Sequence, residues 1–133
     1  MFFSRIFIFI TALLLYVTSQ ADVGICFETD GNLKKPISLI FTIKSDAEAT
    51  VRYKEGSIDI FLTKIGEKTI SPRAQVPATV QTKWKENTNG VDSGYYYLTS
   101  TGANAVELLY VRGKDGKYFK FFDKQQNPEL NCG

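Results

Sequence analysis

The sequence predicts an all-β protein, a small antiparallel barrel or sandwich of about eight strands whose termini are joined by a disulfide. Apolar and polar residues alternate with a period of two in segments that recur about every eight to twelve residues. Glycine, proline and asparagine steps separate these segments. Outside the predicted leader at 1–21, no helical period persists over about ten residues. These three observations favour a chain made mostly of strands.

The clearest strand covers residues 36–44, because its side chains alternate and Pro36 opens it, where a missing N–H is tolerated. The face predicted to be buried consists of Ile37, Leu39, Phe41 and Ile43. The face predicted to meet solvent consists of Ser38, Thr42 and Lys44. After a turn, the residues predicted to point inward from a second strand at 49–54 are Ala49, Val51 and Tyr53.

Two more alternating segments lie on either side of an irregular stretch. A strand is predicted at 57–63, with one face made of Ile58, Ile60 and Leu62. Residues 65–78 contain a glycine and two prolines, and they are predicted to be the longest loop. A strand is predicted at 78–86, with one face made of Val80, Thr82 and Trp84. The Asn-Gly step at 89–90 then favours a turn.

Residues 93–110, SGYYYLTSTGANAVELLY, are predicted to form two adjacent strands around a tight turn. Alternation places Tyr95 and Tyr97 on one face. Tyr96 and Leu98 lie on the other face, and we expect this second pair in the core. The rest of the chain is predicted to contain a turn at 113–116, a strand at 117–122 and a return to the disulfide at 127–132.

Residues 1–21 are predicted to be a secretory signal peptide. Arg5 supplies a positive region, an apolar stretch follows, and residues 19–21 form a small-x-small cleavage site. The uninterrupted apolar run at 6–17 is shorter than the roughly 20 residues that span a bilayer, so a retained anchor is disfavoured. We expect residues 22–133 to form a single domain that is periplasmic or secreted, with no membrane association after cleavage.

Two cysteines follow the leader, Cys26 and Cys132, and we expect them to pair in an oxidising compartment. The sequence contains no Cys-x-x-Cys motif and no histidine, so redox and metal-binding roles are disfavoured and no cofactor is predicted. The sixteen Lys and Arg and fourteen Asp and Glu are interspersed, and removal of Arg5 leaves a net charge of about +1. This balance disfavours nucleic acid as a partner.

Catalysis is disfavoured as well. Without histidine the commonest general base is missing, and no serine or cysteine has a recognisable activating partner. The carboxylates that fall mostly in predicted turns or on solvent faces are Asp22, Glu28, Asp30, Asp46, Glu48, Asp59, Asp92 and Asp115. Tyrosine and tryptophan are frequent in protein interfaces and equally frequent in β cores. The composition therefore favours a binding protein over an enzyme.

Several local patterns occur together in this chain. CFETDGNLKKPISLIF joins a cysteine, an Asp-Gly step and an alternating strand, ATVRYKEG looks like a hairpin, and LNC ends with an Asn-Cys pair. The residues that fit a Gly-x-Tyr, Ser-x-Gly, Ala pattern are Gly94, Tyr96, Ser100, Gly102 and Ala105. In these features the chain resembles the periplasmic inhibitors of c-type lysozyme known as MliC/PliC. The resemblance implies an eight-stranded antiparallel barrel with a cysteine near each end.

In that family an exposed Ser-Gly-x-x-Tyr loop and a Ser-Lys-Gly turn enter the active-site cleft of lysozyme. The resemblance therefore implies a protein that occludes a cleft of a lysozyme-like enzyme. Ser93, Gly94 and Tyr97 match the first motif, whereas Thr101 stands where the family has lysine. The predicted partner contacts are Ser93, Tyr97, Ser100, Thr101 and Gly102. We expect the turn at 100–104 to be placed in a concave partner site.

Two other functions fit a small exported barrel without catalytic residues. One is an immunity protein that guards the periplasm against a toxin delivered by another bacterium. The other is a carrier whose barrel interior stays open for a small apolar ligand. An adjacent toxin gene would favour the first, and an empty apolar interior would favour the second.

Overall fold

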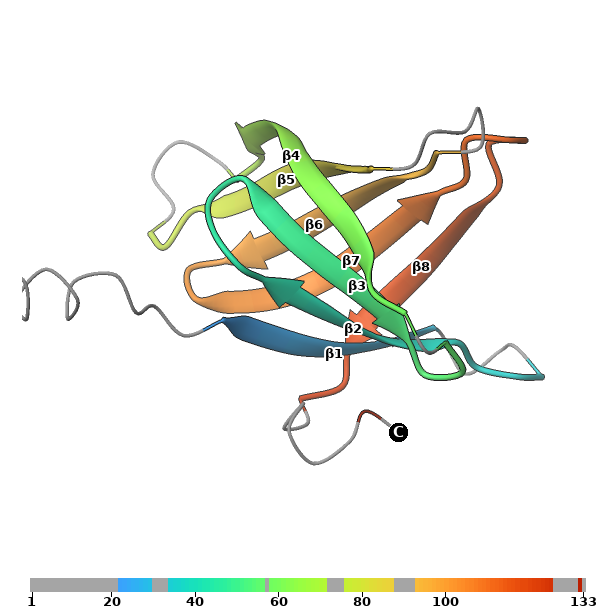
Figure 1. Ribbon diagram of the computed structural model, residues 1–133. Coiled ribbons are helices and arrows are strands. Elements are labelled where there is room, and N and C mark those ends of the chain that lie inside the picture. The colour runs from blue at the N-terminus through green and yellow to red at the C-terminus, as the bar shows by residue number, and fades with distance from the viewer. Residues whose placement is uncertain are drawn as a thin grey trace, which may run out of the picture.

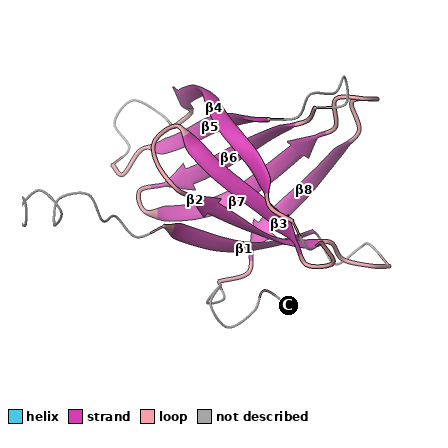
Figure 2. Cartoon of the chain, viewed as in Figure 1, coloured by secondary structure: helices cyan, strands magenta, loops and turns pink. Residues whose placement is uncertain are grey.

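The chain folds into eight antiparallel strands that close into a barrel (Figures 1 and 2). The computed structural model describes residues 22–29, 34–56, 58–71, 76–87, 93–125 and 132. The strands are β1 (Val23–Thr29), β2 (Ser38–Ile43), β3 (Glu48–Tyr53), β4 (Ile60–Thr69), β5 (Thr79–Glu86), β6 (Tyr95–Thr101), β7 (Asn104–Val111) and β8 (Tyr118–Asp123). Each strand pairs with the next, and β1 pairs with β8. The predicted all-β class is confirmed, and the barrel is selected over the sandwich.

No helix occurs in these ranges, and among them no helical segment of a length and hydropathy suited to crossing a membrane was found. The predicted signal peptide at 1–21 lies outside the described residues, as do Asp30, Asp92 and most of the stretch at 127–132. The predictions for those residues stay predictions.

The barrel interior is filled by the inward side chains of all eight strands. Its buried members are Phe27, Leu39, Phe41, Ala49, Val51, Leu62, Trp84, Tyr96, Leu98, Leu108 and Phe121. The ring of Phe41 meets Trp84 and Tyr96 edge to face, with centroids 5.6 and 6.4 Å apart. An eight-stranded barrel is just wide enough for side chains to fill it. The prediction that Tyr96 and Leu98 belong to the core is confirmed.

The alternation predicted for 36–44 and 49–54 is confirmed on the inner face, with one correction on the outer face. Ser38 was expected to meet solvent, yet only 7% of it is exposed. Its hydroxyl donates a hydrogen bond of 3.0 Å to Oε2 of Glu28 on the neighbouring strand β1. This bond satisfies the hydroxyl and lets Ser38 be buried at little cost.

The fourth strand differs from its prediction at both ends. Residues 65–69, expected to belong to a loop, continue β4, because a β-bulge between Lys64 and Gly66 adds a residue and interrupts the period of two. At the other end Ile58, predicted to share a face with Ile60 and Leu62, is 74% exposed, whereas Leu62 is buried. Asp59 forms an ion pair of 2.8 Å with Arg52, and β4 begins only at Ile60.

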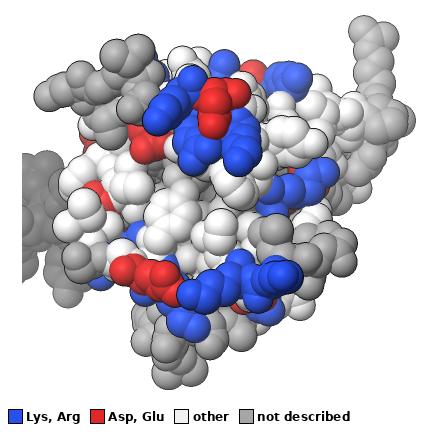
Figure 3. All heavy atoms as spheres, turned by 90° about the vertical axis from the view of Figure 1, so that its right-hand side faces the viewer, with Lys and Arg blue, Asp and Glu red and all other residues white. Residues whose placement is uncertain are grey.

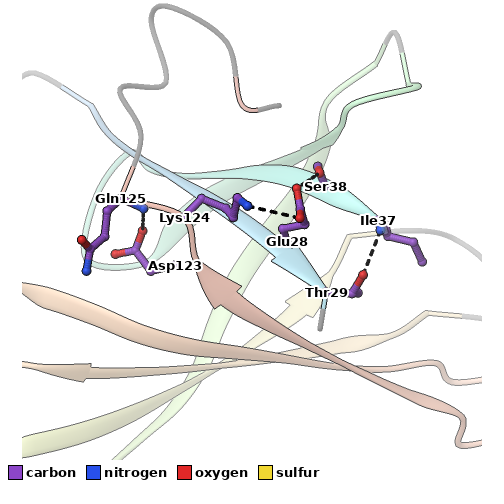
Figure 4. Close-up of polar contacts among 7 residues, drawn as sticks. All are labelled: Glu28, Thr29, Ile37, Ser38, Asp123, Lys124 and Gln125. Carbon is purple, nitrogen blue, oxygen red and sulfur yellow. Dashed lines mark hydrogen bonds and ion pairs between the residues drawn. The ribbon is translucent and has the colours of Figure 1, made fainter. Parts of the chain in front are cut away.

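The first and last strands are joined by contacts around Glu28 (Figure 4). The Glu28 carboxylate accepts a hydrogen bond from Ser38 and another of 3.2 Å from Nζ of Lys124. The Ser38 hydroxyl, with a smaller contribution from Lys124, holds the pKa of Glu28 below its usual value of 4.5. The backbone N–H of Lys124 also donates to the carbonyl of Cys26, at 2.9 Å. Glu28 therefore contacts β2 and the residue that follows β8.

Further bonds fix the ends of these strands. Oγ1 of Thr29 accepts from the N–H of Ile37 at 2.9 Å, and Oδ1 of Asp123 accepts from the N–H of Gln125 at 2.7 Å (Figure 4). The predicted disulfide between Cys26 and Cys132 is present, with Cα atoms 5.4 Å apart. It spans 106 residues of sequence and lies beside the β1–β8 ladder.

Removing the disulfide should lower the free energy of unfolding by about 4 to 5 kcal/mol, because the bridge closes a loop of about 100 residues in the unfolded chain. Guanidinium denaturation of the double variant Cys26→Ala/Cys132→Ala tests this, with the oxidised protein as reference. The unaltered protein unfolded in the presence of dithiothreitol is the control and should match the double variant. Equal midpoints of guanidinium denaturation for the oxidised protein and the double variant would contradict the expectation.

Candidate functional site

The two ends of the barrel differ in their connections. One end, which we name the hairpin end, has the turns at 44–47 and 102–103 and the β4–β5 loop, and it lies at the left of Figure 1. The opposite end, which we name the loop end, has the other four connections between consecutive strands. Strands of six to ten residues separate the two ends.

The structure does not bring the five predicted contact residues into one surface. Ser93 precedes β6 at the loop end, and Gly102 follows β6 at the hairpin end. At about 3.3 Å per residue, the strand between them spans roughly 25 Å. Tyr97 lies between these two positions on the outer face of β6, because its neighbours Tyr96 and Leu98 are both buried inside. Only Tyr97 therefore lies near the centre of a continuous outer face.

The β6–β7 turn is packed against the neighbouring loop. Gly102 has a φ of 60°, a left-handed conformation that favours glycine. A Cβ on it would lie 3.2 Å from the ring of Pro77. Oγ1 of Thr101 is 2.9 Å from Oγ1 of Thr79. Ser100 lies on the inner face and borders a groove of about 370 Å³ that Gly102 also lines. The turn is thus one wall of a groove at the hairpin end.

Two rows of side chains cross the outer face of β5 to β8. The first row, in register across the four strands, is Lys83, Tyr97, Leu109 and Lys120. The second row is Lys85, Tyr95, Val111 and Tyr118. Together these eight residues form what we name the lysine–tyrosine face. Directly opposed side chains on one sheet face interact, so each row is a continuous strip of contacts.

Lys83 organises the centre of the lysine–tyrosine face. Its Nζ lies 4.7 Å from the ring centroid of Tyr95 and 5.4 Å from that of Tyr97. Such cation–π contacts contribute about 0.5 to 1 kcal/mol each at exposed sites. Lys120 pairs with Glu107 at 3.7 Å, whereas Lys83 and Lys85 have no ion pair within the described ranges. Two cations beside tyrosine rings are therefore available to an acidic partner.

A tyrosine cluster is buried beneath the loop end. The hydroxyl oxygens of Tyr53 and Tyr96 are 2.7 Å apart. The ring centroids of Tyr96 and Tyr110 are 4.7 Å apart. Burial raises the pKa of Tyr53 to about 12 and raises the pKa of Tyr96 further. Burial, together with a hydrogen bond to Glu86, also raises the pKa of Tyr110. These hydroxyls stay protonated near neutral pH and can donate hydrogen bonds.

Glu86 anchors this cluster to the start of β6. Only 8% of Glu86 is exposed, and its Oε1 accepts a hydrogen bond of 3.1 Å from the N–H of Gly94. A buried carboxylate needs such donors to offset its desolvation. The carboxylates singled out from the sequence did not include Glu86. The sequence could have predicted that Glu86 points inward, because Glu86 continues the alternation of Thr82 and Trp84.

Gly94 leaves no room for a side chain. A Cβ there would overlap Cε2 of Tyr110 and would lie 2.6 Å from Oε1 of Glu86. Tyr96, two residues later, is fully buried. The Gly-x-Tyr pattern that suggested the family resemblance therefore has a structural role in this barrel.

The loop end also presents charge. Figure 3, which looks onto this end, shows Lys and Arg side chains along its upper and lower margins around a largely uncharged centre. The cations of this end include Lys35, Lys54, Arg112, Lys114 and Lys117. A groove of about 280 Å³ lies between Lys35 and Lys54 and includes Tyr53 in its lining. Arg112 is paired with Asp115 at 2.7 Å.

Within the described ranges, no group of three His, Cys, Asp or Glu side chains is placed to hold a metal ion. In the comparisons with known proteins, no family model, no curated protein and no solved structure matches this chain.

Replacing Gly94 by alanine should lower the free energy of unfolding by about 1 to 3 kcal/mol, because the new methyl must displace Tyr110 or Glu86. Gly66→Ala is the matched control. A Cβ on Gly66 meets only Cβ of Lys83, at 3.8 Å, so its effect should stay within about 0.5 kcal/mol. Urea denaturation of both variants checks the difference, and equal losses would contradict the geometry.

The stability of the protein should fall as pH rises from 10 toward 12. Because the pKa of Tyr53 is raised from 10 to about 12, the native protein keeps a proton that the unfolded chain releases. Each such tyrosine removes about 1.4 kcal/mol per pH unit over that window. Tyr53→Phe should therefore make the decline shallower. Tyr118→Phe, at a ring that is 69% exposed, is the control, and equal slopes for the two variants would contradict the expectation.

Proposed function

We propose that this protein is exported, has no catalytic activity and binds another protein through the lysine–tyrosine face, and that its partner is a c-type lysozyme. The observation that supports this most directly is the pair of cross-strand rows centred on Lys83 and Tyr97. Tyrosine supplies a large contact area at low entropic cost, and aromatic residues are enriched where binding energy concentrates. The disulfide is typical of an oxidising compartment outside the cytoplasm.

The resemblance to lysozyme inhibitors supports the choice of partner. Such inhibitors are eight-stranded antiparallel barrels with a cysteine near each end, and this chain has that architecture. The family's lysine is absent at Thr101, but Lys83 and Lys85 provide cations on the adjacent strand. Glycosidases cleave their substrates with a pair of carboxyl groups. Cations that approach those carboxyl groups would attract the inhibitor and block the substrate.

The mechanism we propose is occlusion by a rigid surface. The lysine–tyrosine face lies on four hydrogen-bonded strands, and Lys83 holds two of its rings through cation–π contacts. A face that is already ordered loses little conformational entropy on binding. Ser93 lies at one end of β6 and contributes only at the margin of this contact, whereas Ser100, Thr101 and Gly102 lie at the other end.

The structure supports the two alternative functions, an immunity protein and a small-ligand carrier, to different degrees. An immunity protein could use the same face against a delivered toxin, and an adjacent toxin gene would favour it. A carrier with an open interior has less support, because Phe27, Phe41, Tyr96 and Phe121 occupy the barrel centre with 1% exposure or less.

Exported protein at micromolar concentration should slow the clearing of a bacterial suspension by a c-type lysozyme, as measured by turbidity. The variants Lys83→Ala and Tyr97→Ala should each weaken inhibition by about tenfold, because each removes a central contact. Arg52→Ala, at an exposed position of β3 outside the proposed face, is the matched control. The proposal fails if the unaltered protein does not inhibit, or if all three variants behave alike.

A further inference from the structure

Part of one edge of β4 has no strand partner among the described residues. β4 has ten residues and β3 has six, and they pair only where Ile60–Thr63 faces Glu48–Val51. The N–H of Lys64 then donates to the carbonyl of Ala47 at 2.9 Å. Beyond it, β4 pairs with β5 on one side, and no strand of the described ranges pairs with its other side. In Figure 1 this part of β4 rises above β3.

The alternation of an antiparallel ladder shows which backbone groups face outward. The N–H of Ile70 donates to Thr79 of β5 at 2.8 Å, so Lys68 and Gly66 also direct their backbone groups toward β5. Glu67 and Thr69 consequently direct their N–H and C=O groups away from β5, at exposed positions. This edge can pair with an additional extended strand.

Exposed apolar side chains lie along the same strand and at the residue that follows it. Phe61, Ile65 and Ile70 are 61%, 48% and 47% exposed. Large apolar side chains beside an unpaired edge are the combination expected where another chain docks. Backbone hydrogen bonds would supply affinity there, and the side chains would supply selectivity.

Charge argues against a second copy of this chain as the occupant. Outward-facing residues must oppose each other, so the two-fold antiparallel registers that use Glu67 within 65–69 place it opposite Glu67, Ile65 or Thr69. The second register also places Lys64 opposite Lys68, and the third places Lys68 opposite Lys68. All three registers oppose like charges, which is destabilising. The edge is therefore protected against self-association but remains open to a segment of different sequence.

The outer face of this edge specifies the chemistry of the segment. Gly66, Lys68 and Ile70 share that face, with a groove of about 290 Å³ beside Gly66 and an apolar side chain at Ile70. Glu67 is paired with Lys64 at 3.8 Å, whereas Lys68 has no ion pair within the described ranges. We propose that the open edge at 65–69 binds an extended segment of another protein with the pattern apolar, any residue, acidic, any residue, apolar. This proposal does not depend on the lysozyme proposal.

A blocked pentapeptide of sequence Val-Thr-Asp-Thr-Val is a suitable probe, with Val-Thr-Lys-Thr-Val as its control. Titration of the exported protein, followed by NMR, should shift the amide signals of Glu67 and Thr69 and slow their hydrogen exchange. The acidic peptide should bind about tenfold more tightly than the lysine peptide, and Lys68→Glu should reverse that order.

Proline at position 67 isolates the backbone contribution. Glu67→Pro removes an outward N–H and leaves the ladder with β5 intact, so it should weaken binding by about tenfold. Glu67→Ala keeps that N–H and is the matched control. The proposal is overturned if the two variants bind alike, if the acidic peptide leaves both amides unchanged, or if both amides are already protected in the free monomer. Sedimentation that shows a dimer disrupted by Glu67→Pro would also overturn it, in favour of a second copy.

Discussion

Closure of the barrel depends on its shortest ladder. Only three residue pairs join β1 to β8, whereas six join β1 to β2. Two further connections tie β1 to the chain that follows β8: the disulfide of Cys26 with Cys132 and the bond of 3.2 Å that Glu28 accepts from Lys124. A ladder of three pairs gives limited stabilisation alone, so covalent and charge-assisted bonds complete the closure. The filled interior and the rigid outer faces both depend on this closure of the barrel.

In the closed barrel, alternate side chains of each strand point into the core, and the others point to the outer face. In β6 the even positions Tyr96 and Leu98 fill the core, and the odd positions Tyr95 and Tyr97 form part of the outer face. Three consecutive tyrosines therefore have two different environments. One hydroxyl is buried in a hydrogen-bonded cluster, and two rings meet Lys83 on the surface.

Alternation and the cysteine pair were enough to predict the fold class, the disulfide and most of the core, because alternation is a local property of the sequence and the two cysteines after the predicted leader allow a single pairing. The extension of β4 was missed because the bulge at Lys64 and Gly66 breaks the period on which the prediction relied. The lysine–tyrosine face could be predicted only in part. Alternation assigns Lys83 and Tyr97 to outer faces, but their contact depends on the register between β5 and β6. Glu86 was predictable from its strand, whereas its bond with Gly94 depends on the tertiary structure.

Trp84 is the single tryptophan of the chain, and it is 2% exposed where Phe41 meets it. Its indole N–H donates to Oγ1 of Thr82 at 2.9 Å, so both its apolar and its polar parts have fixed neighbours. An indole so placed acts as a built-in optical reporter. The wavelength of its fluorescence distinguishes a dry, sealed interior from one that water has entered, without any attached label.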